Sequence, residues 1–520
     1  MRSSFSRLTL ADRIAMVISL LAVAAAYLVS SRVFEYLAHI EDEQAYLWQA
    51  QAVARGKLTV PIPPGENSFL VPFVVDYNGQ RFGKYPPGWP ALLGIGVRLG
   101  LRAWVNPLLA GLGVWLTYRL GKRTFGEAAG LLAAGLTLTS PFFLMNSGSL
   151  LSHSFGLVLS AAFAMAWLDL FADEPFRRPW LPTLVAGLCL GLMALTRPLT
   201  AVAVAAPFGL HGLYLLVRGE AATRRRLLRL GLIVLAMASL HFVWQFAVTG
   251  DPFINPYTLW WEYDRIGFGP GIGRVQGGHN LGQAYVNTNN SLLAGVNDLF
   301  GWGPFSWILL PFGVLATLVK PRSRPFCLRA LLIASVFPSL VLFYLAYWIG
   351  ASLFGPRYYY EGLFSLTIFS AVGFGFLAGW PTRPGEPWRC ETGWRKLRPL
   401  GMTALLALLV GLNLIFYTPM RVGGMHGLYG VERAHITPFL TPQAQELAPA
   451  LIVVHPQKKW IEYGTLLELE NPFLDTPFIF IISRGPEVDN AVAAHFPERN
   501  VYHYYQDEPY KFYTAPREKR

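Results

Sequence analysis

HIEDEQAYLWQAQAVARGK (residues 39–57) begins about one turn after an apolar stretch that is long enough to cross a membrane. Three acidic residues in a row, Glu41, Asp42 and Glu43, therefore stand where the bilayer is expected to end. Apolar and aromatic residues follow at helical spacing, which predicts an amphipathic helix on the outer membrane face: Tyr46, Leu47, Ala50 and Val53. Acidic residues are favourable near a helix N-terminus, so helix capping explains the acids without any chemistry.

The composition is that of an integral membrane protein. Of 520 residues, 53% are hydrophobic and 14% are charged, whereas an average soluble domain is about 25% charged. The net charge of +12 comes from Lys and Arg clusters between apolar runs, where they indicate membrane topology and not a nucleic-acid partner. Cys189, Cys327 and Cys390 lie in an apolar run or beside basic clusters and predict neither a disulfide nor a metal site.

Apolar runs of span length recur along most of the chain. The first is IAMVISLLAVAAAYLVS (residues 14–30), which follows three arginines and is predicted to be an uncleaved helix with a cytoplasmic N-terminus. Ten more follow, near residues 104–119, 127–145, 154–171, 180–195, 198–217, 228–248, 292–318, 327–349, 358–379 and 400–418. We therefore expect about 11 transmembrane helices and an extracytoplasmic C-terminus, and basic residues are concentrated in alternate loops as this topology requires.

The predicted topology places the long loops and the tail on the extracytoplasmic side. A membrane domain (1–418) would carry two such loops, at 32–88 and 249–291. Residues 419–520 are predicted to form a small extracytoplasmic α/β domain. Its expected strands are ALIVVH (450–455), PFIFII (477–482) and NVYHYY (500–505), and its expected helix is EVDNAVAAHF (487–496). No glycine-rich phosphate loop follows these strands, so they predict no nucleotide site.

Three further motifs accompany the acids at 41–43. KYPPGWP (84–90) closes the first loop, with prolines that stiffen the turn into the next helix. LTRPLT (195–200) follows a short span, and FGPRYYYEGLF (354–364) opens a late one. In this order the set resembles the GT-C glycosyltransferases, and in particular the branch that holds protein O-mannosyltransferases and the aminoarabinose transferases of lipid A (glycosyltransferase family 39). The resemblance covers roughly residues 1–420.

The resemblance implies transfer of a sugar from a polyprenyl-phosphate carrier to an acceptor on the outer face of the inner (plasma) membrane. Such a reaction needs a carboxylate that takes the acceptor proton and cations that stabilise the leaving phosphate. We expect Asp42 to be the general base, with Glu43 orienting its neighbours. Lys84 and Arg357 are expected to contact the phosphate, with Arg197 as a weaker third. The acceptor and cavity candidates are Tyr46, Tyr85, His153 and Tyr358.

Each site residue also has a structural interpretation. Lys84 can extend to the interface as cations at span ends commonly do. Arg357 can pair with Glu361 one helical turn later. His153, in LLSHSFG (150–156), is either an acceptor-orienting residue near a position where this branch often has a second acid, or only a polar helix start.

No cofactor is expected, because no metal-ligand spacing of a zinc site is present; Asp76, Asp251 and Asp264 would bind a divalent ion only if folding brought them together. The expected partners are the lipid-linked sugar, membrane lipids and a glycan, lipid or protein acceptor. This chain has Gln44, Ala45 and Tyr46 where aminoarabinose transferases commonly have a basic residue, which argues against lipid A as acceptor.

Two other functions are alternatives to a glycosyltransferase. One is a lipid-linked sugar transporter or flippase, which is expected to show paired halves with broken helices. The other is a non-catalytic envelope-assembly protein.

Overall fold

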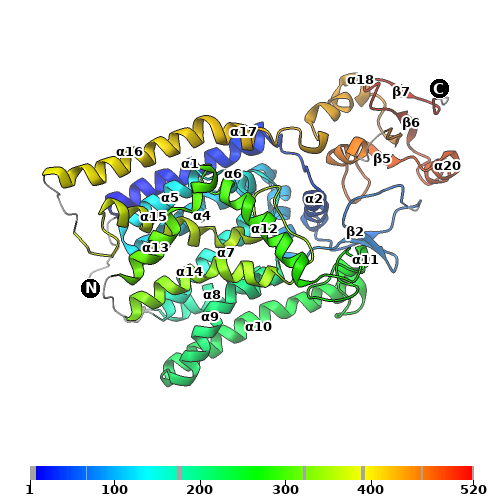
Figure 1. The fold of residues 1–520 in the computed structure, drawn as a ribbon. Coiled ribbons are helices and arrows are strands. Elements are labelled where there is room, and N and C mark those ends of the chain that lie inside the picture. Colours follow the sequence, from blue (N-terminus) through cyan, green and yellow to red (C-terminus); the bar gives the residue numbers. More distant parts are fainter. Residues whose placement is uncertain are drawn as a thin grey trace.

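The structure is a computed structural model that describes residues 8–65, 67–171, 178–319, 324–387, 393–457 and 461–517. Cys390 lies outside the described residues, and Cys189 and Cys327 are free thiols. Figure 1 shows a bundle of long helices with a small mixed domain, formed by the C-terminal part of the chain, at one end.

The bundle contains twelve helices of ten residues or more among the described residues: α1 (Leu10–Arg32), α4 (Val105–Phe125), α5 (Glu127–Leu138), α7 (His153–Leu170), α8 (Trp180–Ala194), α9 (Pro198–Arg218), α10 (Ala221–Thr249), α12 (Leu281–Asp298), α13 (Leu309–Leu318), α14 (Arg324–Tyr344), α15 (Leu363–Ala378) and α16 (Leu397–Leu412). Shorter helices connect or extend them: α6 (Pro141–Gly148), α11 (Pro256–Trp260), α17 (Thr418–Gly423) and the 3₁₀ helices η1 (Arg102–Trp104), η2 (Gly303–Trp307), η3 (Arg357–Gly362) and η4 (Gly393–Lys396). A π-helical turn, η5 (Asn413–Tyr417), joins α16 to α17.

The chain is a multi-pass membrane protein, but the expected 11 spans are not confirmed. Among the described residues, seven helices are long and apolar enough to cross a membrane, or nine if each of two bent pairs is one span. The bent pairs are α5 with α6, at 61°, and α12 with the η2–α13 segment, at 93°. The two remaining runs correspond to α8, which has only 15 residues, and α4, whose last turns carry Arg119, Lys122 and Arg123.

The segment between α1 and α4 holds α2 (Glu41–Ala54), a small sheet and α3 (Gly88–Arg98). Strands β1 (Val60–Pro61), β3 (Gln80–Gly83) and β2 (Val74–Tyr77) form this sheet in the order β1-β3-β2, with antiparallel pairing. The β2–β3 hairpin turns at Asn78-Gly79, where both residues have positive φ as an Asn-Gly turn requires. The hairpin leads Lys84 and the KYPPGWP motif directly into α3.

The prediction that α2 is an amphipathic helix lying on the membrane surface is wrong. Nine of its 14 residues are buried, because α2 lies between the bundle and the C-terminal domain (Figure 1). The contacts with that domain include Gln44 Nε2, 3.3 Å from the backbone oxygen of Gly464, and Gln51 Nε2, 3.3 Å from that of Glu470. The apolar spacing in the sequence reflects burial by protein and not by lipid.

The C-terminal domain is built on a four-stranded sheet in the order β5-β4-β6-β7. Strands β4 (Ala450–Val454), β5 (Phe478–Ile482) and β6 (Asn500–Tyr504) lie in the three segments where strands are expected, and β4 is parallel to both neighbours. The short β7 (Phe512–Tyr513) is antiparallel to β6, and α20 (Pro486–Ala493) lies in the segment of the expected helix. The remaining short helices of the domain are η6 (Leu428–Gly430), η7 (Arg433–His435), η8 (Thr437–Leu440), α18 (Pro442–Gln445), α19 (Ile461–Gly464) and η9 (Thr465–Leu469).

Candidate active site

A cavity of about 780 Å³ opens between the first loop, the 249–274 segment and the ends of α9, α14 and η3. Its wall carries seven of the nine residues that the sequence singles out: Asp42, Tyr46, Lys84, Tyr85, Arg197, Arg357 and Tyr358. The other two, Glu43 and His153, lie behind the wall. Four separate motifs therefore converge on one space that is large enough for a ligand.

Glycine at position 88 lets two of these motifs meet. The Gly88 amide donates a hydrogen bond to the Leu195 oxygen at 2.8 Å, and a Cβ at Gly88 would lie 2.7 Å from that same oxygen. The turn after KYPPG therefore packs directly on the chain that leads into LTRPLT. This contact brings Lys84 and Arg197 to the same cavity.

Asp42, in the first turn of α2, has two partners in the cavity. Its Oδ1 accepts a hydrogen bond from the Tyr85 hydroxyl, and its Oδ2 lies 3.1 Å from Arg357 Nη2. Burial raises the pKa of Asp42, but the charge of Arg357 and the hydrogen bond from Tyr85 outweigh burial, so this pKa lies below its ordinary value. The carboxylate is therefore ionised at neutral pH, and its side chain keeps 24% of its surface exposed.

Arg357, the first residue of η3, pairs with Asp42 and not with Glu361, so the expected alternative of a pair within one helix is wrong. Its other terminal nitrogen, Nη1, has no hydrogen-bond partner in the described part of the chain. The guanidinium also lies 5.6 Å from the ring centre of Tyr358. Arg357 lines the cavity, but this unused donor is itself buried.

Lys84 is 3% exposed, so the alternative in which it extends to the interface is wrong. Its Nζ lies 3.0 Å from Asp264 Oδ2 and 3.8 Å from the ring centre of Phe73. Burial lowers the pKa of Lys84 below its ordinary value, and the charge of Asp264 opposes that shift. Asp264 also accepts a hydrogen bond from Trp348 Nε1 at 2.9 Å.

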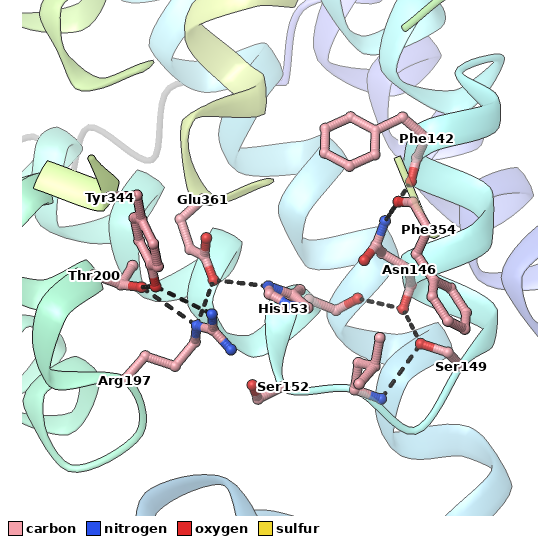
Figure 2. A network of polar contacts seen from close by, with 12 residues as sticks. Phe142, Asn146, Ser149, Ser152, His153, Arg197, Thr200, Tyr344, Phe354 and Glu361 are labelled. Atoms are coloured by element: carbon pink, nitrogen blue, oxygen red, sulfur yellow. Dashed lines mark hydrogen bonds and ion pairs between the residues drawn. The ribbon is translucent and has the colours of Figure 1, made fainter. Parts of the chain in front are cut away.

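Arg197 connects the cavity to a buried polar network, drawn in Figure 2. It lines the cavity, donates to the Tyr344 hydroxyl at 3.1 Å and lies 3.6 Å from Glu361 Oε1. The same Glu361 oxygen is 3.2 Å from His153 Nδ1. The expectation that His153 lines the cavity is wrong, because the start of α7 turns this ring inward against Glu361 (Figure 2).

Glu43 is fully buried and bonds only to backbone amides. Its Oε2 accepts from His39 and Ile40, at 2.8 and 3.3 Å, and its Oε1 accepts from Leu150 at 2.7 Å. Burial raises the pKa of Glu43 to about 7. Glu43 therefore ties the start of α2 to the 149–151 segment and does not face the cavity.

The position of Glu361 depends on a glycine in α7. A Cβ at Gly156 would lie 2.6 Å from Glu361 Oε1 and 2.7 Å from Glu361 Cγ. We expect Gly156→Ala to lower the free energy of unfolding by about 1 to 3 kcal/mol, because the buried acid has to move. The measurement is the thermal unfolding midpoint in one detergent. The matched control is Gly209→Ala in α9, where a Cβ meets no atom within 4 Å, and equal midpoints for the two variants would contradict the packing.

Asp264 and Glu361 are the site residues that the sequence does not identify as such. The sequence treats Asp264 as a scattered acid and Glu361 only as a partner for Arg357. The three cations with their carboxylates are Arg357 with Asp42, Lys84 with Asp264 and Arg197 with Glu361, at 3.1, 3.0 and 3.6 Å. Among the described residues, no group of three His, Cys, Asp or Glu side chains could hold a metal ion.

Comparisons with known proteins agree with this architecture. A family model described as dolichyl-phosphate-mannose-protein mannosyltransferase matches residues 86–244. No curated protein matches the chain. The crystal structure of ArnT from Cupriavidus metallidurans bound to undecaprenyl phosphate matches with a TM-score of 0.57 at 14% identity, over 93% of this chain and 88% of that one.

Two further solved structures show the same fold. ArnT from Cupriavidus metallidurans in the apo state has a TM-score of 0.54 at 15% identity, over 93% of this chain and 88% of that one. The oligosaccharyltransferase of Archaeoglobus fulgidus in the apo form has a TM-score of 0.51 at 14% identity, over 96% of this chain and 70% of that one. The resemblance to GT-C fold glycosyltransferases that the motifs indicate is therefore confirmed.

Proposed function

We propose that this protein is a glycosyltransferase that moves a sugar from a polyprenyl-phosphate donor to a hydroxyl of a glycan, lipid or protein acceptor on the extracytoplasmic face of the inner membrane. The observation that carries the proposal is the convergence of Asp42, Lys84, Arg197 and Arg357 on one cavity. The fold, shared with a structure that binds undecaprenyl phosphate, supports this donor class.

The proposed reaction is a displacement at the anomeric carbon. The acceptor oxygen forms a bond to that carbon, and its proton passes to the Asp42 carboxylate. The bond from the anomeric carbon to the phosphate oxygen breaks, and its electron pair stays on the phosphate. The donor phosphodiester carries one negative charge and the leaving polyprenyl phosphate gains a second, so cations that bind the phosphate stabilise the transition state more than the ground state.

Arg357 is the cation best placed for this work. Its Nη2 bonds to Asp42, and its Nη1 is buried without a partner in the described structure. In this proposal the bound phosphate draws Nη1 toward the cavity, and one guanidinium then contacts the phosphate and the base together. Arg197 and Lys84, which also line the cavity, would add positive charge. Tyr85 would hold the Asp42 carboxylate in place through its hydrogen bond.

Donor consumption by the purified protein tests the proposal. The protein in nanodiscs is incubated with a panel of polyprenyl-phosphate sugars, and release of polyprenyl phosphate is followed by mass spectrometry. We expect one donor to be consumed with formation of a glycosylated acceptor. Specific binding of a donor without release of polyprenyl phosphate, in the presence of membrane and envelope extracts as acceptors, would contradict an enzymatic function and favour a transporter.

The pH dependence of the reaction distinguishes the two adjacent acids. A general base acts when ionised, so activity is present above its pKa and is lost as the pH falls through it. Because the pKa of Asp42 lies below its ordinary value, we expect kcat/KM for the donor to stay level from pH 8 to pH 5. If Glu43 were the base, kcat/KM would fall with a midpoint near its pKa of about 7. Size-exclusion profiles at each pH serve as the control for folding.

A further inference from the structure

A second cavity, of about 350 Å³, lies between α2 and the C-terminal domain. We call it the outer cavity; the residues used below to describe it are Gln44, Trp48, Gln51, Phe69, Glu470 and Phe473. Its volume is at the lower end of the range of about 300 to 1,000 Å³ that is usual for small-ligand sites. None of the residues assigned to the reaction above lines it.

The two cavities lie on opposite sides of α2. Asp42 and Tyr46 are one turn apart and face the larger cavity. Gln44, Trp48 and Gln51 face the outer cavity, as expected because each helical residue is rotated by about 100° from the one before. A helix about 10 Å wide therefore separates the outer cavity from the proposed base.

Glu470 is the most informative residue of the outer cavity. It is 7% exposed, and its Oε2 accepts only a long hydrogen bond, 3.4 Å, from the Phe480 amide. No hydrogen bond from a described residue reaches its Oε1, and no described cation forms an ion pair with it. Burial raises the pKa of Glu470 to about 8, so at neutral pH the carboxyl carries a proton that it can donate to a ligand.

Two amides add acceptor oxygens. Gln44 Nε2 bonds to the backbone oxygens of Ala38 and Gly464, each at 3.3 Å. Gln51 Nε2 bonds to the backbone oxygen of Glu470, also at 3.3 Å. These contacts use the amide nitrogens and leave both amide oxygens without a partner in the described structure. The rings of Trp48, Phe69 and Phe473 form aromatic parts of the wall.

We propose that the outer cavity is a binding site for a neutral saccharide unit, and that this unit belongs to the acceptor, away from the hydroxyl that reacts. Hydroxyl groups both donate and accept, so they match one protonated carboxyl and two amide oxygens. The apolar faces of a sugar ring can pack on the aromatic walls. The assignment to the acceptor rests on the proposed glycosyltransferase function, whereas the saccharide chemistry rests on the cavity itself.

Charged ligands fit the outer cavity less well. An anion would meet two carboxyl groups, those of Glu470 and Glu498. An amine beside Glu470 would require that carboxyl to ionise where burial opposes the charge, and Glu498, which is 66% exposed, already lies 3.9 Å from Arg499. The Arg81 side chain also lines the cavity, but its guanidinium is bound to Asp76 at 2.6 Å and to the Phe69 oxygen at 2.9 Å. A neutral ligand leaves these pairs undisturbed.

Direct binding tests the proposal independently of turnover. The full-length Asp42→Asn protein in nanodiscs is titrated with mannotriose, maltotriose and N-acetylchitotriose, and binding is followed by saturation-transfer NMR. We expect at least one of these saccharides to bind. Introducing Glu470→Leu or Gln51→Leu into this protein is expected to weaken binding tenfold or more, whereas Glu470→Gln, which keeps the shape and a donor, is expected to retain it.

Two results would overturn the proposal: no saccharide binds, or saccharide binding is unchanged by Glu470→Leu. Steady-state kinetics of otherwise wild-type protein then test the assignment to the acceptor. Glu470→Leu is expected to raise KM for the acceptor with kcat unchanged, and an unchanged KM would overturn that assignment. Saccharide binding without any sugar transfer by the wild-type protein would refute the proposed function and leave the binding site standing. Sugar transfer without saccharide binding in the outer cavity would refute the binding site and leave the proposed function standing.

Discussion

Asp42→Asn is expected to lower kcat for sugar transfer by about 10²- to 10⁴-fold, the range for removal of a general base. The substitution keeps the size of the side chain and removes its ability to accept a proton. Asp42 lies in the first turn of α2, and loss of a partly buried charge there weakens a helix by up to about 2 kcal/mol. A large fall in kcat with a folded protein therefore reports chemistry and not capping.

Glu41→Gln is the matched control for Asp42→Asn. Glu41 stands in the same first turn and also lines the cavity, but its exposed side chain forms no ion pair with a described residue. This variant therefore removes a charge from the helix N-terminus and leaves the base and its pair with Arg357 in place. We expect it to turn over at a rate close to that of the wild type. An Asp42→Asn protein that transfers sugar as fast as Glu41→Gln would show that the acids at 41–43 only start a helix.

Arg357→Gln is expected to lower kcat by about 10²- to 10³-fold, as removal of a preorganised charge-stabilising donor does in other enzymes. Arg357→Lys is expected to recover only part of this loss, because an ammonium group cannot contact Asp42 and the phosphate through two separate nitrogens. The measurement is single-turnover release of polyprenyl phosphate, which separates the chemical step from donor binding.

A double-mutant cycle shows whether Arg357 and Asp42 act together. The two side chains are 3.1 Å apart, so the effects of Arg357→Gln and Asp42→Asn on the activation free energy are expected to be non-additive. The double variant should then be little slower than the slower single variant. Full additivity, or an Arg357→Gln variant that changes only KM for the donor, would contradict a role of Arg357 in the transition state.

Much of the fold could be predicted because bilayer crossing imposes a strong pattern. Each expected apolar run coincides with a helix or a bent pair of helices. Two of these helices are not long and apolar enough to count as membrane spans: α4 carries cations in its last turns, and α8 has only 15 residues. The burial of α2 could not be predicted. Its apolar spacing has the same form whether lipid or the C-terminal domain covers the helix, and only tertiary contacts such as that of Gln44 with Gly464 decide the question.

The site shows the same division between local pattern and tertiary contact. Lys84 and Arg357 could be singled out because cations are scarce on the extracytoplasmic side of the predicted topology. Their carboxylate partners could not, since Asp264 lies 180 residues from Lys84 in the chain. Arg357 could equally have paired with Glu361, four residues away. The choice of Asp42 depends on the packing of η3 against α7 and α14, which places Arg357 opposite the start of α2.

The most direct test of the central claim is the position of the donor phosphate. A cryo-electron microscopy structure of the wild-type protein with added undecaprenyl phosphate would locate it. The account predicts a phosphate within hydrogen-bond distance of Arg357, flanked by Lys84 and Arg197, with the Asp42 carboxylate beside the space for the sugar. A phosphate bound elsewhere on the protein, with the pair between Arg357 and Asp42 unchanged, would contradict it.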